Sequence, residues 1–331
     1  MSTVDSAVSS ASARIALREG LRSPILIAGV VTIALILLGN IISPGFASAN
    51  QIVNLLRVAS FLGVLSIGQT IVMITGGGGL DLSVGKVATF AAIIGSRVMQ
   101  GDNAQFVQGV VLALVLCALI GLFNGLGITI LGIPPFVMTL GMTGVVYGLI
   151  MVVTGGKAAG RAAPALTGLV NGSFLFGLPG VLFLWAALAV VTTLLLRRTV
   201  FGWRVFAVGA NRTTSEFSTV PVRRTVTTAY VMASVFAGLG GLLLVGYTES
   251  VMLDLADSYT MPSIAAVIIG GTLAIGGVGG YLGTAVGAVT LTVLTSLLTT
   301  MDMSSAWRTI INGTVLLVLL SFYGRQKKLR A

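Results

Sequence analysis

Few residues in this chain could support catalysis. Its 331 residues include no histidine, one cysteine and only nine acidic residues. The absence of histidine excludes catalytic triads and zinc sites that use this residue, and the lone Cys117 excludes an intrachain disulfide. No general acid/base pair, metal cluster or activated nucleophile is apparent in the sequence. We therefore expect no enzyme activity, no metal site and no cofactor.

The segment VGKV, residues 84–87, resembles the end of a phosphate-binding loop but does not complete one. The P-loop pattern requires a glycine six residues before the lysine and a Ser or Thr directly after it. Leu80 and Val87 occupy those two positions. We therefore expect that this chain does not bind ATP through this motif.

The most unusual polar stretch is ITGGGGLDLSVG, residues 74–85, in which four glycines precede a carboxylate and a serine. The glycines break a helix, and Asp81 can accept hydrogen bonds from the free N–H groups at the next helix start. Two roles stay open, because Asp81 and Ser83 either shape a structural elbow or Asp81 contacts a solute. A second glycine cluster follows at 276–277. The elbow candidates are Gly78, Gly79, Asp81, Ser83, Gly276 and Gly277.

The elements that must position these residues are apolar. The chain is 56% hydrophobic and 8% charged, with a mean hydropathy of +1.05, whereas soluble domains carry about 25% charged residues. We predict an all-α integral membrane protein. Apolar segments lie at about 24–43, 52–74, 84–100, 106–131, 136–154, 179–196, 225–247, 262–275, 282–300 and 306–323. They predict about ten spans, or eight if the short, glycine-flanked segments at 84–100 and 262–275 are re-entrant.

The charges orient these spans. With a cytoplasmic N-terminus, 14 of the 19 basic residues fall inside, Lys86 among them, and five fall outside. We expect a cytoplasmic tail at 1–23, a transmembrane domain at 24–323 with an outer loop at 248–261, and a cytoplasmic tail at 324–331. The apolar run at 24–43 is too long for a cleaved signal, so we expect it to be retained. The net charge of +10 is dispersed at segment ends, so nucleic-acid binding is not expected.

The longest cytoplasmic interruption covers residues 197–224 and carries six basic residues and one acid. One interpretation is a solvated loop that only orients the protein. The other is a short helix that docks into a cytoplasmic partner. Glycine clusters after apolar runs in both halves also suggest inverted repeats, with a pathway at their interface.

Several motifs together resemble one family. GGLDLSVG at 78–85 is similar to the GGIDLSVG signature of permease subunits of bacterial ABC importers for monosaccharides, of the ribose/xylose/arabinose type. GLFNG, PFVMTLG, VGANRTTSEFS and GGTLAIGGVGGYLGTAVGA match further landmarks in order, at 121–125, 135–141, 208–218 and 270–288. Tyr147 stands where the family usually has Arg.

The resemblance implies a permease of the bacterial inner membrane, with both termini cytoplasmic, that translocates a monosaccharide or small polyol. It implies contact with membrane lipid and three protein partners. These are a cytoplasmic ABC ATPase, an extracytoplasmic sugar-binding protein and a second permease, which is identical or different. A branched-chain amino-acid permease and a stand-alone channel or facilitator remain as alternatives.

The resemblance also assigns residues. It places the ATPase-coupling contact at Gly209, Asn211, Glu216, Phe217, Ser218 and Val220. For the translocation pathway, the candidates are Asn124, Phe136 and Thr139. A polar Asn124 in an apolar span should face protein or pathway rather than lipid, and Phe136 could stack on a sugar ring or form a gate. Helix packing is the alternative for all three.

Overall fold

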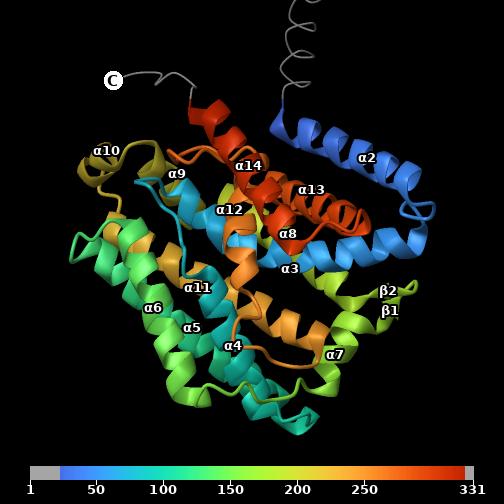
Figure 1. Cartoon of the computed structure of the whole chain (residues 1–331). Coiled ribbons are helices and arrows are strands. Elements are labelled where there is room, and N and C mark those ends of the chain that lie inside the picture. Colours follow the sequence, from blue (N-terminus) through green and yellow to red (C-terminus); the bar gives the residue numbers. More distant parts are fainter. Residues whose placement is uncertain (1–22, 325–331) are drawn as a thin grey trace, which may run out of the picture.

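The computed structural model describes residues 23–324 (Figure 1). Each of the ten apolar segments forms a helix, which confirms the all-α class. Their bounds are α2 Pro24–Ile42, α3 Ala49–Ile74, α4 Val84–Met99, α5 Phe106–Thr129, α6 Pro135–Thr154, α8 Gly180–Arg198, α11 Val222–Thr248, α12 Thr260–Ile269, α13 Tyr281–Thr300 and α14 Ser305–Gly324.

Among the described residues, seven helices are long and apolar enough to cross a membrane: α2, α3, α5, α6, α8, α11 and α13. The two segments expected to be short are short, because α4 has 16 residues and α12 has ten, below the roughly 20 that a span needs. The expected total of ten spans is therefore not established. The seven candidate spans do support a predominantly helical integral membrane protein.

Smaller elements occupy the connections, and the sequence did not indicate most of them. Residues 197–224 hold two helices instead of one, α9 Val200–Ala210 and α10 Arg212–Phe217. The connection before α8 contains α7 Pro164–Asn171 and an antiparallel pair, β1 Ser173–Leu175 with β2 Leu178–Pro179. Short 3₁₀ turns, η1 Asn103–Gln105 and η2 Asp257–Tyr259, precede α5 and α12.

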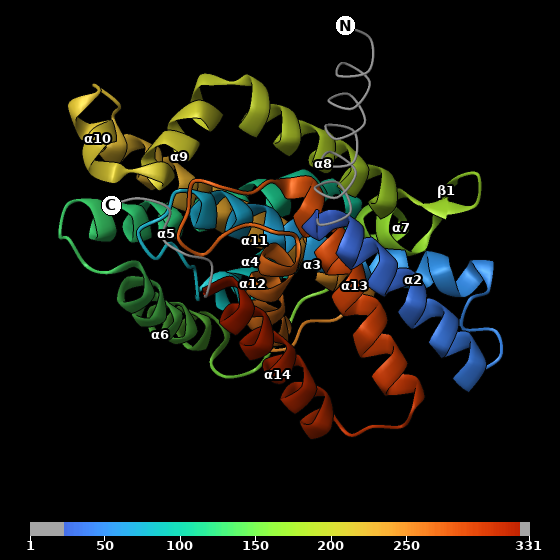
Figure 2. The ribbon, with the colours of Figure 1, turned by 90° about the horizontal axis from the view of Figure 1, so that it is seen from above.

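Two helices form the centre of the bundle. Most of α3 and α11 is buried, whereas α2, α5, α6 and α8 expose apolar side chains outward, as lipid-facing helices do. Helix α5 packs closely against α11 at Gly121 and Gly125. A Cβ at either position would overlap the backbone of Tyr230 or Thr227, so glycine is what allows the two helices to approach. Helices α9 and α10 lie at one edge of the molecule, opposite the β1–β2 pair (Figures 1 and 2).

Candidate functional site

Three segments that are distant in sequence meet at one point, which we call the glycine junction. It comprises Ile74, Gly76, Gly209, Gly276 and Gly277. The Gly277 N–H donates to the Ile74 carbonyl at 2.9 Å. A Cβ on Gly209 would overlap that carbonyl and the Gly277 nitrogen, and one on Gly276 would overlap the backbone of Gly76. We call the glycine-rich connection between α3 and α4 the first elbow, and the one between α12 and α13 the second elbow. The end of α9 is therefore packed directly between the two elbows, with no side chain in between.

Backbone conformation adds a second reason for glycine here. Gly76, Gly276 and Gly277 have φ angles of 71°, 100° and 72°, a region that residues with a Cβ rarely adopt. Among the predicted elbow residues, Gly78 also has a positive φ of 74°, and Gly79 packs against the Val72 carbonyl within its own turn. The two elbows are thus built from backbone that any larger residue would strain.

Buried polar groups support the inside of the first elbow. Asp81 Oδ1 accepts from the Ser83 N–H at 2.9 Å and from the Ser83 hydroxyl at 2.5 Å, and Asn124 Nδ2 donates to the same hydroxyl oxygen at 3.2 Å. Thr139 Oγ1 accepts from the Leu82 N–H at 3.1 Å. Helices α5 and α6 therefore position the elbow through Asn124 and Thr139.

The role of Asp81 differs from helix capping. Ser83 is the N-cap residue of α4 and makes no side-chain cap bond, and the carboxylate of Asp81 closes the turn before it instead. Asp81 is completely buried, as are Asn124 and Thr139. This burial favours the structural interpretation of Asp81 over contact with a solute. The third pathway candidate, Phe136, is 51% exposed, and only its backbone carbonyl meets this group, where it accepts from Thr139 Oγ1 at 3.5 Å.

The predicted coupling segment forms α10 and presents one large apolar side chain. Asn211 caps the helix, since its Oδ1 accepts from the Thr214 N–H at 3.0 Å. Phe217 is 86% exposed. The Glu216 carboxylate already has an ion-pair partner, because it lies 3.4 Å from Arg212 Nε on the same helix. The last turn ends at Ser218, and the Val220 N–H returns to the Ser215 carbonyl.

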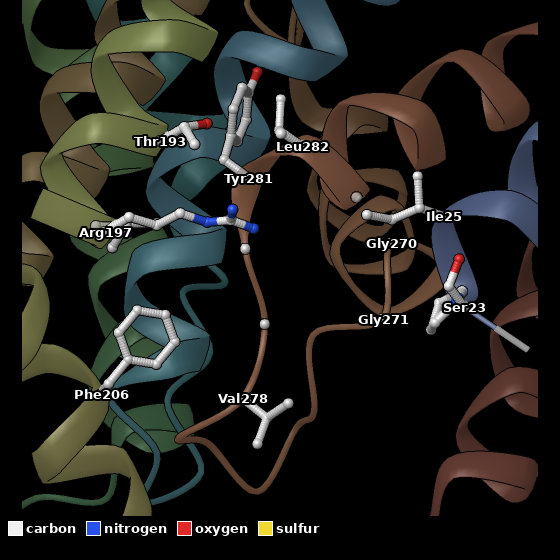
Figure 3. Close-up of a pocket in the computed structure, with 15 residues that line it drawn as sticks. Ser23, Ile25, Thr193, Arg197, Phe206, Gly270, Gly271, Val278, Tyr281 and Leu282 are labelled. Atoms are coloured by element: carbon white, nitrogen blue, oxygen red, sulfur yellow. The ribbon is translucent and has the colours of Figure 1, made fainter. Parts of the chain in front are cut away.

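A cavity of about 210 Å³ opens on the other side of the second elbow (Figure 3). The Arg197 guanidinium, at the end of α8, points into it toward the chain between Val278 and Tyr281 (Figure 3). The start of α2 forms the opposite wall. The second elbow therefore touches packed backbone at the glycine junction but borders open space here.

One polar group that the sequence analysis missed joins α4, α6 and the connection before α12. Lys86 Nζ lies 2.5 Å from Asp257 Oδ2 and 4.8 Å from the centroid of the Tyr147 ring. The sequence analysis placed Lys86 in a cytoplasmic connection and Asp257 in the outer loop. Because the two side chains form an ion pair, they cannot lie on opposite sides of the membrane, and at least one of these placements is wrong. With Lys86 removed from the cytoplasmic set, the split becomes 13 against five, so the direction of the charge bias is unchanged.

Comparison with known proteins gives the family. The model of the family described as branched-chain amino acid transport system / permease component matches residues 51–320. A probable ABC transporter permease of Sinorhizobium fredii is 30% identical over 305 residues, 91% of this chain and 90% of the relative. A ribose import permease of Bacillus subtilis is 30% identical over 286 residues, 86% and 88% of the two chains.

A galactose/methyl galactoside import permease of Escherichia coli is 30% identical over 330 residues, covering 90% of this chain and 95% of the relative. No solved structure matches the chain. The residues that the family model matches include the two elbows, α10 and the membrane-span candidates other than α2. The chain therefore belongs to the family of branched-chain amino acid transport system / permease components, as a multi-pass membrane permease of the ABC transporter type.

Proposed function

We propose that this chain is the permease subunit of an ABC importer that carries a monosaccharide or a similar small polyol across the bacterial inner membrane. The observation that carries the proposal is the likeness, over most of both chains, to import permeases named for ribose and galactose. The family description also names branched-chain amino acids, so uptake of leucine is the main alternative. A stand-alone channel is the alternative from another class.

The arrangement of α10 supports an energy-supplying partner. Phe217, the last residue of α10, is 86% exposed, and α10 lies at the edge of the molecule (Figure 1). Exposed aromatic side chains are frequent anchors in protein interfaces. We infer that a cytoplasmic ATPase subunit binds here. Gly209 lies at the glycine junction, only eight residues before Phe217 in the sequence. Movement of the docked helix would therefore reach both elbows over a short path.

The remaining parts of the proposal concern assembly and orientation. A second permease, identical or different, and an extracytoplasmic sugar-binding protein would complete the importer, as the family resemblance implies. The charge bias supports cytoplasmic termini and an outer position for the connection at 248–261, apart from Asp257, which pairs with Lys86. Residues 1–22 and 325–331, which make up most of the two predicted tails, lie outside the described residues.

For the pathway, Asn124, Phe136 and Thr139 stay a prediction. Replacing each with Ala should change transport rate or substrate preference if the side chains face the solute. Unchanged transport in all three variants would leave Asn124 and Thr139 with only their observed role in bracing the first elbow.

The test is uptake by the assembled transporter. The complex, purified with its associated subunits, is reconstituted into proteoliposomes and supplied with ATP on the cytoplasmic side. Labelled ribose, galactose, a small polyol and leucine are then compared, with and without ATP. We expect ATP-dependent accumulation of a sugar or polyol. Accumulation of leucine alone would identify an amino-acid permease, and ATP-independent equilibration would identify a channel.

A further inference from the structure

Lys86, Asp257 and Tyr147 come from three different elements and meet around one ammonium group. Lys86 Nζ forms an ion pair with Asp257 Oδ2 at 2.5 Å and lies 4.8 Å from the Tyr147 ring centroid, within the range of a cation–π contact. We call these three residues the Lys86 cluster. The predicted site residues do not include it.

The cluster lies at membrane depth. Tyr147 is 12 residues beyond Pro135, the start of the 20-residue α6, so it lies about 18 Å along a span about 30 Å long. The start of α4 is anchored independently beside the same helix. The Leu82 N–H donates to Thr139 Oγ1, and Thr143 Oγ1 donates to the Leu82 carbonyl. Lys86, one turn further along, is therefore level with Tyr147.

The geometry of the cluster is fixed by backbone contacts. Thr89 Oγ1, on α4, accepts from the Ala256 N–H at 3.0 Å, one residue before Asp257. Gly85 lies so close to the Ala256 carbonyl that it has no room for a Cβ. The connection that carries Asp257 is thus held against α4 on both sides of Lys86, and the ion pair is preorganised rather than a chance surface contact.

The charge and partial exposure of the cluster favour a polar neighbour over lipid. The Lys86 side chain is 14% exposed, that of Asp257 is 36% exposed and Tyr147 is 47% exposed. Ionisable groups at membrane depth face protein or a water-filled cavity, because charge is costly in hydrocarbon. Asp257 Oδ1 also has no hydrogen-bond partner among the described residues, so this carboxylate keeps one acceptor that the ion pair with Lys86 does not use.

The chemistry suits a neutral polyhydroxylated solute. An aromatic ring can pack against the C–H face of a sugar, while the carboxylate accepts from hydroxyls and the ammonium donates to them. The pair is neutral as a whole, so a neutral solute binds without leaving an unbalanced charge.

We propose that the Lys86 cluster is a sugar-contact point in the translocation pathway, on the exposed side of α6 that carries Tyr147. This inference rests on the proposed function for the identity of the solute. The placement of the cluster at a water-filled surface does not depend on the solute, so the two can fail separately.

The first experiment measures water access. Gly144 lies one turn before Tyr147 on the same side of α6 and has open space at its Cβ position, so Gly144→Cys leaves the cluster intact. Val145, at nearly the same depth, is 56% exposed on another face, where it lines an apolar groove. The native Cys117 is buried. Both variants are treated, in the full complex in cells, with a charged thiol reagent.

We expect the reagent to label Gly144→Cys at least tenfold faster than Val145→Cys, and the transported sugar to slow labelling of Gly144→Cys. Equal rates, or no labelling at either position, would mean that the cluster faces lipid or protein, and would overturn the inference. If no sugar is transported at all, the proposed function fails, while the ratio of the two labelling rates still decides whether this surface is wet.

The second experiment separates solute contact from a structural role. The double variant Lys86→Met/Asp257→Leu removes both charges and leaves none unpaired, which structural ion pairs tolerate well. We expect its KM for sugar to rise at least fivefold, as in Tyr147→Ala, with ATPase co-purification unchanged. Asp254→Asn, in the same connection, is the matched control and should keep the native KM. A native KM in the double variant would overturn the inference.

Discussion

The glycine junction makes the sharpest prediction, because Gly209 has no space for a single methyl group. In Gly209→Ala, the new Cβ would overlap the Ile74 carbonyl and the Gly277 nitrogen. Overpacking of a well-packed interior costs about 1–3 kcal/mol. Loss of the Gly277 N–H hydrogen bond to Ile74 would add about 1 kcal/mol. We therefore expect the variant to be less stable by roughly 2–4 kcal/mol, the sum of both effects.

The assay compares Gly209→Ala with Gly141→Ala. Both glycines lie in helices, so both variants gain the same helix propensity, up to about 1 kcal/mol, but Gly141 has no atom near its Cβ position. Unfolding in detergent and transport-linked ATP hydrolysis are measured for each variant. We expect lower stability and weaker coupling only in Gly209→Ala. If the two variants behave alike, the packed contact between α9 and the elbows has no energetic importance.

Three further outcomes are expected. Phe217→Ala should reduce ATPase co-purification more than Glu216→Ala does. An aromatic anchor that becomes buried in the interface contributes about 2 kcal/mol or more, whereas an exposed ion pair contributes less than about 1 kcal/mol. Equal loss of co-purification in the two variants would contradict this. Asp81→Leu removes the acceptor for both Ser83 hydrogen bonds and should destabilise by about 1–3 kcal/mol, whereas Asp81→Asn should retain most stability; thermal unfolding compares them. Ser250→Cys should react with an impermeant thiol reagent in intact cells, and silence there would reverse the predicted topology.

Hydropathy predicted the helices well, for a physical reason. Lipid accepts only helices whose backbone groups are paired internally, so long apolar runs such as those of α3 and α11 have one available structure. The short α4 and α12 were also predictable, because glycine clusters interrupt the apolar run beside each of them. In contrast, α9 was missed because its apolar stretch has only 11 residues and lies in a segment rich in basic residues, which is also typical of a solvated loop.

The contacts of the candidate site were not predictable in the same way. Gly209 and Gly277 could be identified as conformationally special, but a glycine carries no chemical signal that names its partner. Lys86 was assigned to a cytoplasmic connection because a buried elbow and a surface turn use the same residue types. Only the hydrogen bonds from Leu82 to α6 show that the chain turns inside the bundle.

The two groups of contacts suggest how the permease divides its work. The glycine junction links α9 to both elbows through backbone alone, so a displacement at α10 is transmitted without passing through flexible side chains. The first elbow leads directly into α4, which carries Lys86 three residues after its N-cap, Ser83. A shift of this elbow would move Lys86, and through the hydrogen bonds of Leu82 it would also act on α6, which carries Tyr147. Coupling and solute contact would then meet on one short helix, and that is the reason to test Gly209 and the Lys86 cluster in the same complex.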